Sequence, residues 1–171
     1  KIKEEIERYS IIRAVTAVER ADVVIIVIDA TEGVTEQDAK IAGIAHDRGK
    51  GIIIAVNKWD AIEKDNNTVK KHTEKIRQIL SFMPYAEILF ISAKSGQRLN
   101  KIFEMIDVVI ENNSMRVATG VLNEIVTEAV AMQQPPTDKG KRLKIYYVTQ
   151  VAVKPPTFVV FVNDKNLMHF S

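Results

Sequence analysis

Two short polar stretches have residue types and spacing that could recognise a heterocyclic base. The first reads Asn57-Lys58-Trp59-Asp60 and the second Ser92-Ala93-Lys94. An ionised Asp60 can accept two parallel hydrogen bonds from the N1–H and exocyclic amine of a guanine edge, a charge-assisted pairing that is both strong and geometrically selective. Adenine places an acceptor where this carboxylate needs a donor, so a site built on these bonds rejects it. The two stretches therefore indicate guanine recognition.

The neighbouring side chains have chemistry that suits the same task. Lys58 can lay its methylene stem along one face of the base and keep its ammonium in water, while Lys94 covers the other face. Asn57 can tie its loop to neighbouring loops, and the backbone N–H of Ala93 can donate to the guanine carbonyl. We interpret Trp59 as packing its loop. The predicted guanine-binding residues are Asn57, Lys58, Asp60, Ser92, Ala93 and Lys94. We predict no catalytic residue and no metal ligand in these 171 residues.

The elements that must position these stretches alternate between strands and helices. Continuous β-branched runs predict strands buried on both faces, and apolar residues every three or four positions predict helices. We expect helices at 2–19, 36–48, 68–82 and 99–110, and strands at 23–28, 51–56 and 87–91. This order is typical of an α/β fold with a parallel sheet. Each polar stretch directly follows a strand, where open parallel sheets bind their ligands.

The pattern changes near residues 112–118, where we expect a domain boundary. A helix at 119–132 is followed by strands at 143–153 and 158–162, an α+β order. Strict alternation along the first of these strands would put Ile145 and Tyr147 on one face and Tyr146 and Val148 on the other. Both faces would then be apolar, and one helix covers only one of them. We therefore expect residues 119–171 to act mainly by docking against the neighbouring domain or another partner; the alternative is that a further helix beyond the given residues covers the second face.

Composition sets limits on the protein class. Hydrophobic residues make up 46% and charged residues 27% of 171 residues, with a net charge of +2, so an ordinary globular protein is indicated and charge alone gives no argument for nucleic acid. The absence of cysteine excludes disulfides and thiolate metal sites and suits a reducing, cytoplasmic location. No apolar run approaches the roughly 20 residues of a membrane helix, so no membrane partner is expected. The first residue is not Met, and we expect a piece of a longer protein.

Several of these signals have simpler interpretations. Asn and Asp after a strand are common turn residues, and Ser-Ala-Lys alone carries little information. The pair of stretches is stronger because both fall at strand ends with one helix between them. Asp29 ends a buried strand, where a catalytic or Mg²⁺ role competes with the more common role of starting a turn. The three histidines, His46, His72 and His169, are scattered and form no metal-binding set.

Longer stretches resemble the Der (EngA) family of double GTPases. Those similar to its second GTPase domain are residues 9–14 (Tyr-Ser-Ile-Ile-Arg-Ala), 33–38 (Gly-Val-Thr-Glu-Gln-Asp) and 56–60 (Val-Asn-Lys-Trp-Asp). Residues 142–151 and 155–163 resemble its C-terminal KH-like domain. The resemblance implies GTP hydrolysis with Mg²⁺ and a role in assembly of the large ribosomal subunit. It also implies contacts with that subunit and its rRNA, and with an upstream GTPase domain of the same protein.

The resemblance covers essentially the whole chain, with one major departure. The chain has no G-x-x-x-x-G-K-[ST] phosphate cradle and no D-x-x-G turn, because residues 29–33 contain one residue too many. Family order places both elements before Lys1. We therefore expect the C-terminal portion of the second GTPase domain at 1–113, a partial P-loop-GTPase-type parallel sheet with helices. An incomplete KH-like α+β domain is expected at 117–171. The ligands of the expected Mg²⁺ would lie outside this chain.

The main alternative is a KH-type RNA-binding module on an α/β scaffold without nucleotide hydrolysis. KH domains clamp the nucleic-acid backbone with a G-x-x-G loop, and no two glycines of this chain are three positions apart. A phosphoacceptor or dinucleotide-binding α/β domain is a third possibility, but the chain lacks a paired acidic pocket and a G-x-G-x-x-G motif. Guanine recognition remains the better-supported prediction.

Overall fold

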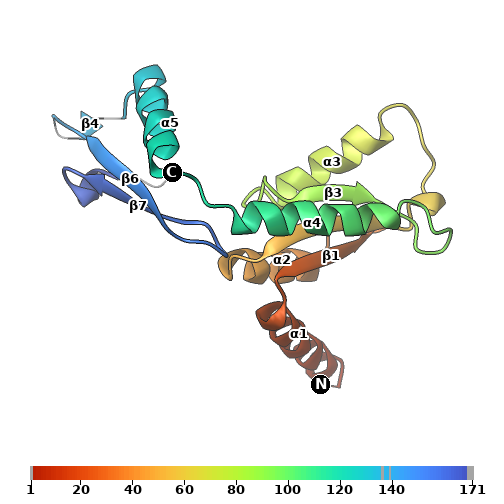
Figure 1. The fold of residues 1–171 in the computed structure, drawn as a ribbon. Helices are drawn as coiled ribbons and strands as arrows, with labels where there is room; N and C mark the ends of the chain where they lie inside the picture. Colours follow the sequence, from red (N-terminus) through yellow and green to blue (C-terminus); the bar gives the residue numbers. More distant parts are fainter. Residues whose placement is uncertain (1, 136, 139, 169–171) are drawn as a thin grey trace. The chain divides into compact units, whose positions relative to one another are not determined.

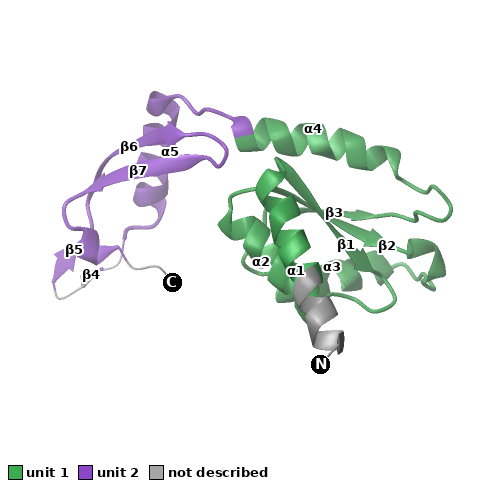
Figure 2. Ribbon diagram, turned by 90° about the horizontal axis from the view of Figure 1, so that it is seen from below, with its two compact units in different colours: residues 1–113 green, residues 114–171 purple. Residues whose placement is uncertain are grey.

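The chain forms two compact units in the computed structural model (Figure 2): unit 1 is Lys1–Asn113 and unit 2 is Ser114–Ser171. The structure describes residues 2–135, 137–138 and 140–168; for residues 2–9 and 138 it describes the backbone only. The last three residues of the expected KH-like domain, which include His169, thus lie outside the described residues.

Unit 1 is a parallel three-stranded sheet with helices (Figure 1). Its elements are α1 (Ile2–Arg20), β1 (Val23–Asp29), α2 (Glu36–Asp47), β2 (Gly51–Asn57), a 3₁₀ turn at Trp59–Ala61, α3 (Thr68–Ile79), β3 (Glu87–Phe90) and α4 (Asn100–Ser114). The strand order is β1-β2-β3, and both pairings are parallel. This confirms the predicted α/β class. The helix expected at 99–110 continues to Ser114, because its polar last turn carries no breaking residue.

The central strand β2 forms the middle of the core. Its first six residues are all buried, as expected for a strand with neighbours on both sides and helices on both faces. Figure 2 shows α4 across one face of the sheet and α2 and α3 across the other. Gly51 marks the closest approach, because a Cβ there would lie 2.5 Å from Cγ1 of Val109 on α4. The absence of a side chain therefore lets α4 rest directly on the sheet.

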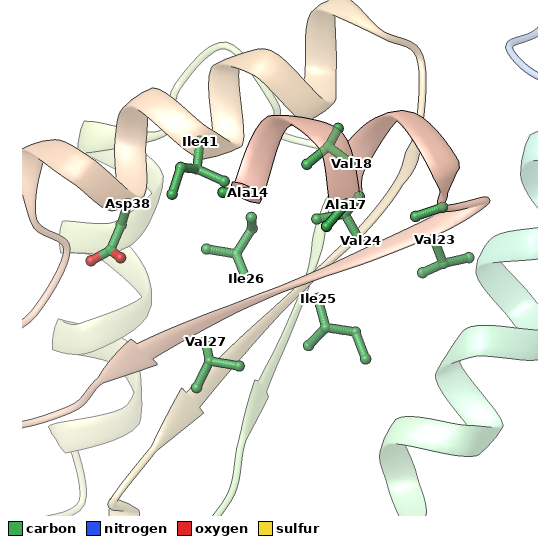
Figure 3. Close-up of a pocket in the computed structure, with 11 residues that line it drawn as sticks. Ala14, Ala17, Val18, Val23, Val24, Ile25, Ile26, Val27, Asp38 and Ile41 are labelled. Atoms are coloured by element: carbon green, nitrogen blue, oxygen red, sulfur yellow. The ribbon is translucent and has the colours of Figure 1, made fainter. Parts of the chain in front are cut away.

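The outer edge of β1 is unpaired within the described residues and borders an apolar groove (Figure 3). The groove has a volume of about 410 Å³ and is lined mainly by small and β-branched residues of α1 and β1. Val27 on this strand is 56% exposed although it belongs to an apolar run. The groove lies along the side of β1, whereas the predicted guanine-binding residues follow the carboxyl ends of the strands.

Unit 2 packs one helix against an antiparallel pair of strands. Its elements are α5 (Thr119–Met132), β4 (Thr137–Asp138), β5 (Lys141–Arg142), β6 (Ile145–Ala152), β7 (Thr157–Val162) and a 3₁₀ turn at Lys165–Leu167. The strands pair as β4-β5 and β6-β7. The bounds of α5 agree with the prediction. The two-residue strands β4 and β5 were not predicted, because they are too short to show a hydrophobic period.

One expectation about β6 is wrong. Tyr146 was expected to share a face with Val148, but Tyr146 is 67% exposed and Val148 is 3% exposed. The pairing of β6 with β7 shifts register between Ile145 and Tyr147. One extra residue in a strand breaks the alternation, so consecutive side chains no longer take opposite faces. Tyr147 is also exposed, while Val148 and Gln150 lie on the buried side.

Candidate functional site

The two predicted loops meet at the carboxyl end of the sheet. We call residues 57–60 the Asn57 loop and residues 92–94 the Ser92 loop. Backbone hydrogen bonds at Ile91, directly before the Ser92 loop, hold the two loops close: the Ile91 N–H donates to the Val56 carbonyl over 2.8 Å, and the Trp59 N–H donates to the Ile91 carbonyl over 3.0 Å. Parallel strands end at the same edge, and the pairing of β2 with β3 therefore brings the loops together.

Asp60 is held by Ser92. The Ser92 hydroxyl donates to Oδ1 of Asp60 over 2.5 Å and accepts from the Ser95 N–H over 3.2 Å. Ser92 is fully buried, whereas Asp60 is exposed. The hydroxyl is the largest cause that lowers the pKa of Asp60 below its ordinary value, and the positive charge of Lys94 adds to the effect. Asp60 therefore presents an oriented, ionised carboxylate at the surface.

Asn57 fastens one loop to the other. Its side-chain carbonyl accepts from the Ala93 N–H over 2.9 Å, as expected for a residue that ties neighbouring loops. Sequence reasoning assigned the same N–H to the carbonyl of the base. In the structure this donor points between the loops toward Asn57, so a base carbonyl would have to share it or replace Asn57 as its acceptor.

Lys58 has an uncommon backbone conformation, and its side chain contacts a residue from the neighbouring strand. Its backbone is left-handed, with φ 60° and ψ 30°, which few residues other than glycine adopt readily. Its ammonium lies 2.5 Å from Oδ2 of Asp29. The Lys58 ammonium, followed by the hydroxyl and N–H of Thr31, lowers the pKa of Asp29 to about 2. The same ion pair raises the pKa of Lys58.

Trp59 anchors the Asn57 loop in the core. It is 2% exposed, and its ring lies 4.4 Å from the Phe90 ring and 5.1 Å from the His72 ring, measured between centroids. This confirms the interpretation of Trp59 as a packing residue. Its burial explains why the residues on either side of it, Lys58 and Asp60, both remain exposed.

The structure brings all six sequence-predicted residues to this edge of the sheet. It also places a seventh residue, Asp29, beside them. Asp29 was interpreted as a turn residue, and it does accept from the Thr31 N–H and hydroxyl. Its contact with Lys58 was missed. The available signal was positional: Asp29 ends β1 in register with Asn57 at the end of β2.

The described part of the chain was also searched for a metal site and for a membrane-spanning helix. No group of three or more His, Asp or Glu side chains there could hold a metal ion. No described helix is both long and apolar enough to span a membrane.

Comparison with known proteins matches each unit to a separate family model. Residues 10–112 match the elongation factor Tu GTP binding domain. Residues 116–171 match the model described as the KH-domain-like region of EngA bacterial GTPase enzymes, C-terminal.

Curated relatives match along the whole chain. The GTPase Der of Agathobacter rectalis is 95% identical over 171 residues, and the GTPase Der of Lachnoclostridium phytofermentans is 75% identical. In both cases the match covers 100% of this chain and 39% of the relative. The chain thus spans well under half the length of these relatives.

Among solved structures, the chain is similar to translation elongation factor SelB from Methanococcus maripaludis in complex with the GTP analogue GppNHp. The TM-score is 0.52 at 25% identity, over 58% of this chain and 22% of that one.

Proposed function

The chain belongs to the Der (EngA) family of GTPases, and on that premise we propose that its parent protein binds and hydrolyses GTP in assembly of the large ribosomal subunit. We assign residues 1–113 to the C-terminal portion of the second GTPase domain and residues 117–171 to part of the KH-like domain. In this proposal the chain supplies the base-recognition half of the nucleotide site.

The observation that carries the proposal is the carboxylate of Asp60, ionised and held by the buried Ser92. An exposed carboxylate fixed at one oxygen can face the N1–H and exocyclic amine of guanine without first losing rotational freedom. Preorganisation of this kind lowers the entropic cost of binding. Guanine selectivity then follows from Asp60 and not from the fold.

The remaining loop residues form the walls of the proposed base site. Lys58, with its side chain 60% exposed, presents its stem to one face of the base, and the exposed Lys94 covers the other. Before a base binds, Asn57 holds the Ser92 loop through the Ala93 N–H. The Ala93 N–H donates to the base carbonyl when that carbonyl displaces the Asn57 oxygen.

Hydrolysis needs parts that these 171 residues do not contain. A phosphate cradle, Mg²⁺ and a positioned water perform phosphoryl transfer, and the G-x-x-x-x-G-K-[ST] motif is absent from the sequence. We assign the phosphate loop and the Mg²⁺ ligands to the remainder of the parent protein. The purified chain by itself should show little or no GTP turnover in a phosphate-release assay, whereas the complete parent should turn over.

The proposed partners follow from the family assignment. They are GTP and GDP, the large ribosomal subunit with its rRNA, and the upstream GTPase domain of the same protein, all met in the cytoplasm. The chain has no cysteine, which is consistent with a reducing compartment. Unit 2 leaves aromatic side chains exposed on β6 and β7, which is consistent with a docking role in the proposed assembly.

The decisive experiment is Asp60→Asn in the complete parent. The amide replaces a double acceptor with one acceptor and one donor, so GDP affinity at this site should fall by about 100-fold, the size expected for a charged bidentate pair. Xanthine carries a carbonyl in place of the amine, so affinity for xanthosine diphosphate should rise. Titrations with both nucleotides measure this exchange. Unchanged GDP affinity with no gain for the xanthine nucleotide would contradict the proposal.

A second candidate function, single-stranded RNA binding by unit 2, is favoured by one observation. Tyr147 and Phe161 are exposed, pair across the two strands and have ring centroids 5.8 Å apart. Exposed aromatic rings on a sheet can stack RNA bases. Sequence-selective binding of short single-stranded RNA by the complete parent, together with no effect of Asp60→Asn on nucleotide choice, would favour this alternative.

A further inference from the structure

Asp29 and Lys58 form the one ion pair at the proposed base site that joins two different strand ends within the described residues. The Lys58 ammonium lies 2.5 Å from Oδ2 of Asp29. Strand pairing places Asp29 opposite Asn57, and the Ala30 N–H donates to the Asn57 carbonyl over 2.9 Å. The register of β1 on β2 therefore determines that this carboxylate meets this lysine.

The carboxylate of Asp29 is itself fixed on its other side. Its Oδ1 accepts from the Thr31 N–H over 2.9 Å and from the Thr31 hydroxyl over 2.7 Å. Only Oδ2 remains for Lys58. The side chain of Asp29 is 20% exposed, so the acidic partner is much less mobile than a typical surface carboxylate.

Lys58 is fixed at both ends by this arrangement. Its backbone is held left-handed next to the buried Trp59, and its ammonium is held by Asp29. The stem between these two points has little freedom left, although the side chain is 60% exposed. A free lysine side chain loses considerable rotamer entropy when it is ordered on a ligand. Here the ion pair with Asp29 takes up part of that loss on folding.

We propose that Asp29 is a positioning residue for the nucleotide site: it orients Lys58 so that its methylene stem, and not its charge, faces the base. This inference rests on the proposed function, because it requires a guanine base beside Lys58. Since its ammonium is neutralised by Asp29, Lys58 contributes through packing on the base. Asp29 itself touches no nucleotide.

The test uses xanthosine diphosphate in the complete parent carrying Asp60→Asn, with excess GDP present. GDP then fills any other guanine site of the parent, and binding of the xanthine nucleotide measures the affinity of the altered site alone. Three further variants are compared in this background: Asp29→Asn, Lys58→Met, and the two together. Asp29→Asn keeps an oxygen for Thr31 and so preserves the turn, while Lys58→Met keeps an apolar stem without the charge.

Asp29→Asn should weaken xanthosine diphosphate binding by about 10-fold, and the double variant should bind within about 2-fold of Lys58→Met alone, because residues that act as a unit are not additive. Glu32→Gln is the matched control. Glu32 is a second acidic residue whose charge acts on Lys58, more weakly than Asp29, so this change should alter affinity by less than about 2-fold.

Two results would overturn the inference: no loss of affinity in Asp29→Asn, or a double variant whose loss equals the product of the two single losses. Either result indicates that Asp29 acts independently of Lys58. These outcomes differ from a failure of the proposed function, in which Asp60→Asn with Asp29 and Lys58 intact would not bind xanthosine diphosphate at all.

Discussion

Polar amide and carboxylate side chains serve opposite purposes in the two units. In unit 1, Asp60 stands in a loop beyond the strands, is held at one oxygen by the Ser92 hydroxyl and remains exposed. In unit 2, Asn123 and Gln150 are turned inward and satisfy backbone groups. The difference shows that position relative to the sheet, more than residue type, decides whether such a side chain is available to a ligand.

The inward role is clearest at Asn123 on α5. Its side-chain amide donates to the Val148 carbonyl over 2.8 Å, and its oxygen accepts from the Val148 N–H over 2.9 Å. The side chain thus takes the place of a neighbouring strand for one residue of β6. Gln150 likewise accepts from the Val117 N–H over 2.7 Å and donates to the Met115 carbonyl over 3.0 Å. Both side chains are committed to holding unit 2 together.

The largest effect on stability should come from Asn123→Leu. It leaves the N–H and carbonyl of the buried Val148 without their partner, and each unpaired buried group costs roughly 1–3 kcal/mol, so a loss of about 3 kcal/mol is expected. Hydrogen exchange at the other amides of β6, whose own hydrogen bonds the substitution leaves in place, measures it. Asn166→Leu, at an exposed asparagine of the same unit, is the control and should change stability by less than about 0.5 kcal/mol. Comparable losses in both variants would break the comparison between the units.

A smaller loss of stability is expected when valine is replaced by alanine, and it should differ between the sheet of unit 1 and the sheet of unit 2. Val56 on β2 is 1% exposed and Val151 on β6 is 53% exposed. Removing two buried methyl groups and leaving a cavity should make Val56→Ala less stable by about 2 kcal/mol, whereas Val151→Ala should cost less than about 0.5 kcal/mol. Urea unfolding of both variants provides the measurement. A cost at Val151 as large as that at Val56 would show that a partner covers that face of β6.

The smallest expected effect is on the stability of unit 1 at acidic pH. It tests whether the ion pairs in the loops of unit 1 contribute to that stability. The pKa of Asp29 is lowered to about 2 by Lys58, and that of Asp65 to about 2 by Lys71. A lowered pKa stabilises the folded state above the ordinary value of 3.8, and this contribution is lost as the pH falls through about 2. Unit 1 should therefore lose stability between pH of about 4 and about 2.

The variant with both Asp29→Asn and Asp65→Asn should show a flatter dependence on pH over this range. Thermal unfolding at a series of acidic pH values compares it with the parent. Both substitutions keep an oxygen that can accept from the local backbone, so the change isolates the contribution of charge. A slope equal to that of the parent would assign the acid sensitivity to other groups.

The sequence by itself determined much of unit 1 and its site. Its β-branched runs predicted the strands, although only β2 is buried along its whole apolar run, and neighbouring parallel strands bring Asn57 and Ser92 to one edge. Residue chemistry then predicted Asp60 as the residue that would recognise guanine. The helix at 119–132 was equally determined by its apolar period. These features follow from local spacing, which a sequence displays directly.

Only the tertiary structure decided the contacts that depend on register. The pairing of β1 with β2 places Asp29 on Lys58, and the irregular pairing of β6 with β7 exposes both Tyr146 and Tyr147. A shift of one residue in either pair would change these neighbours without changing the hydrophobic pattern that predicts the strands. The Ala93 N–H was likewise free to be assigned to a base until the position of Asn57 was known. Register is set by packing across the whole sheet, so the local hydrophobic pattern of the sequence does not predict it.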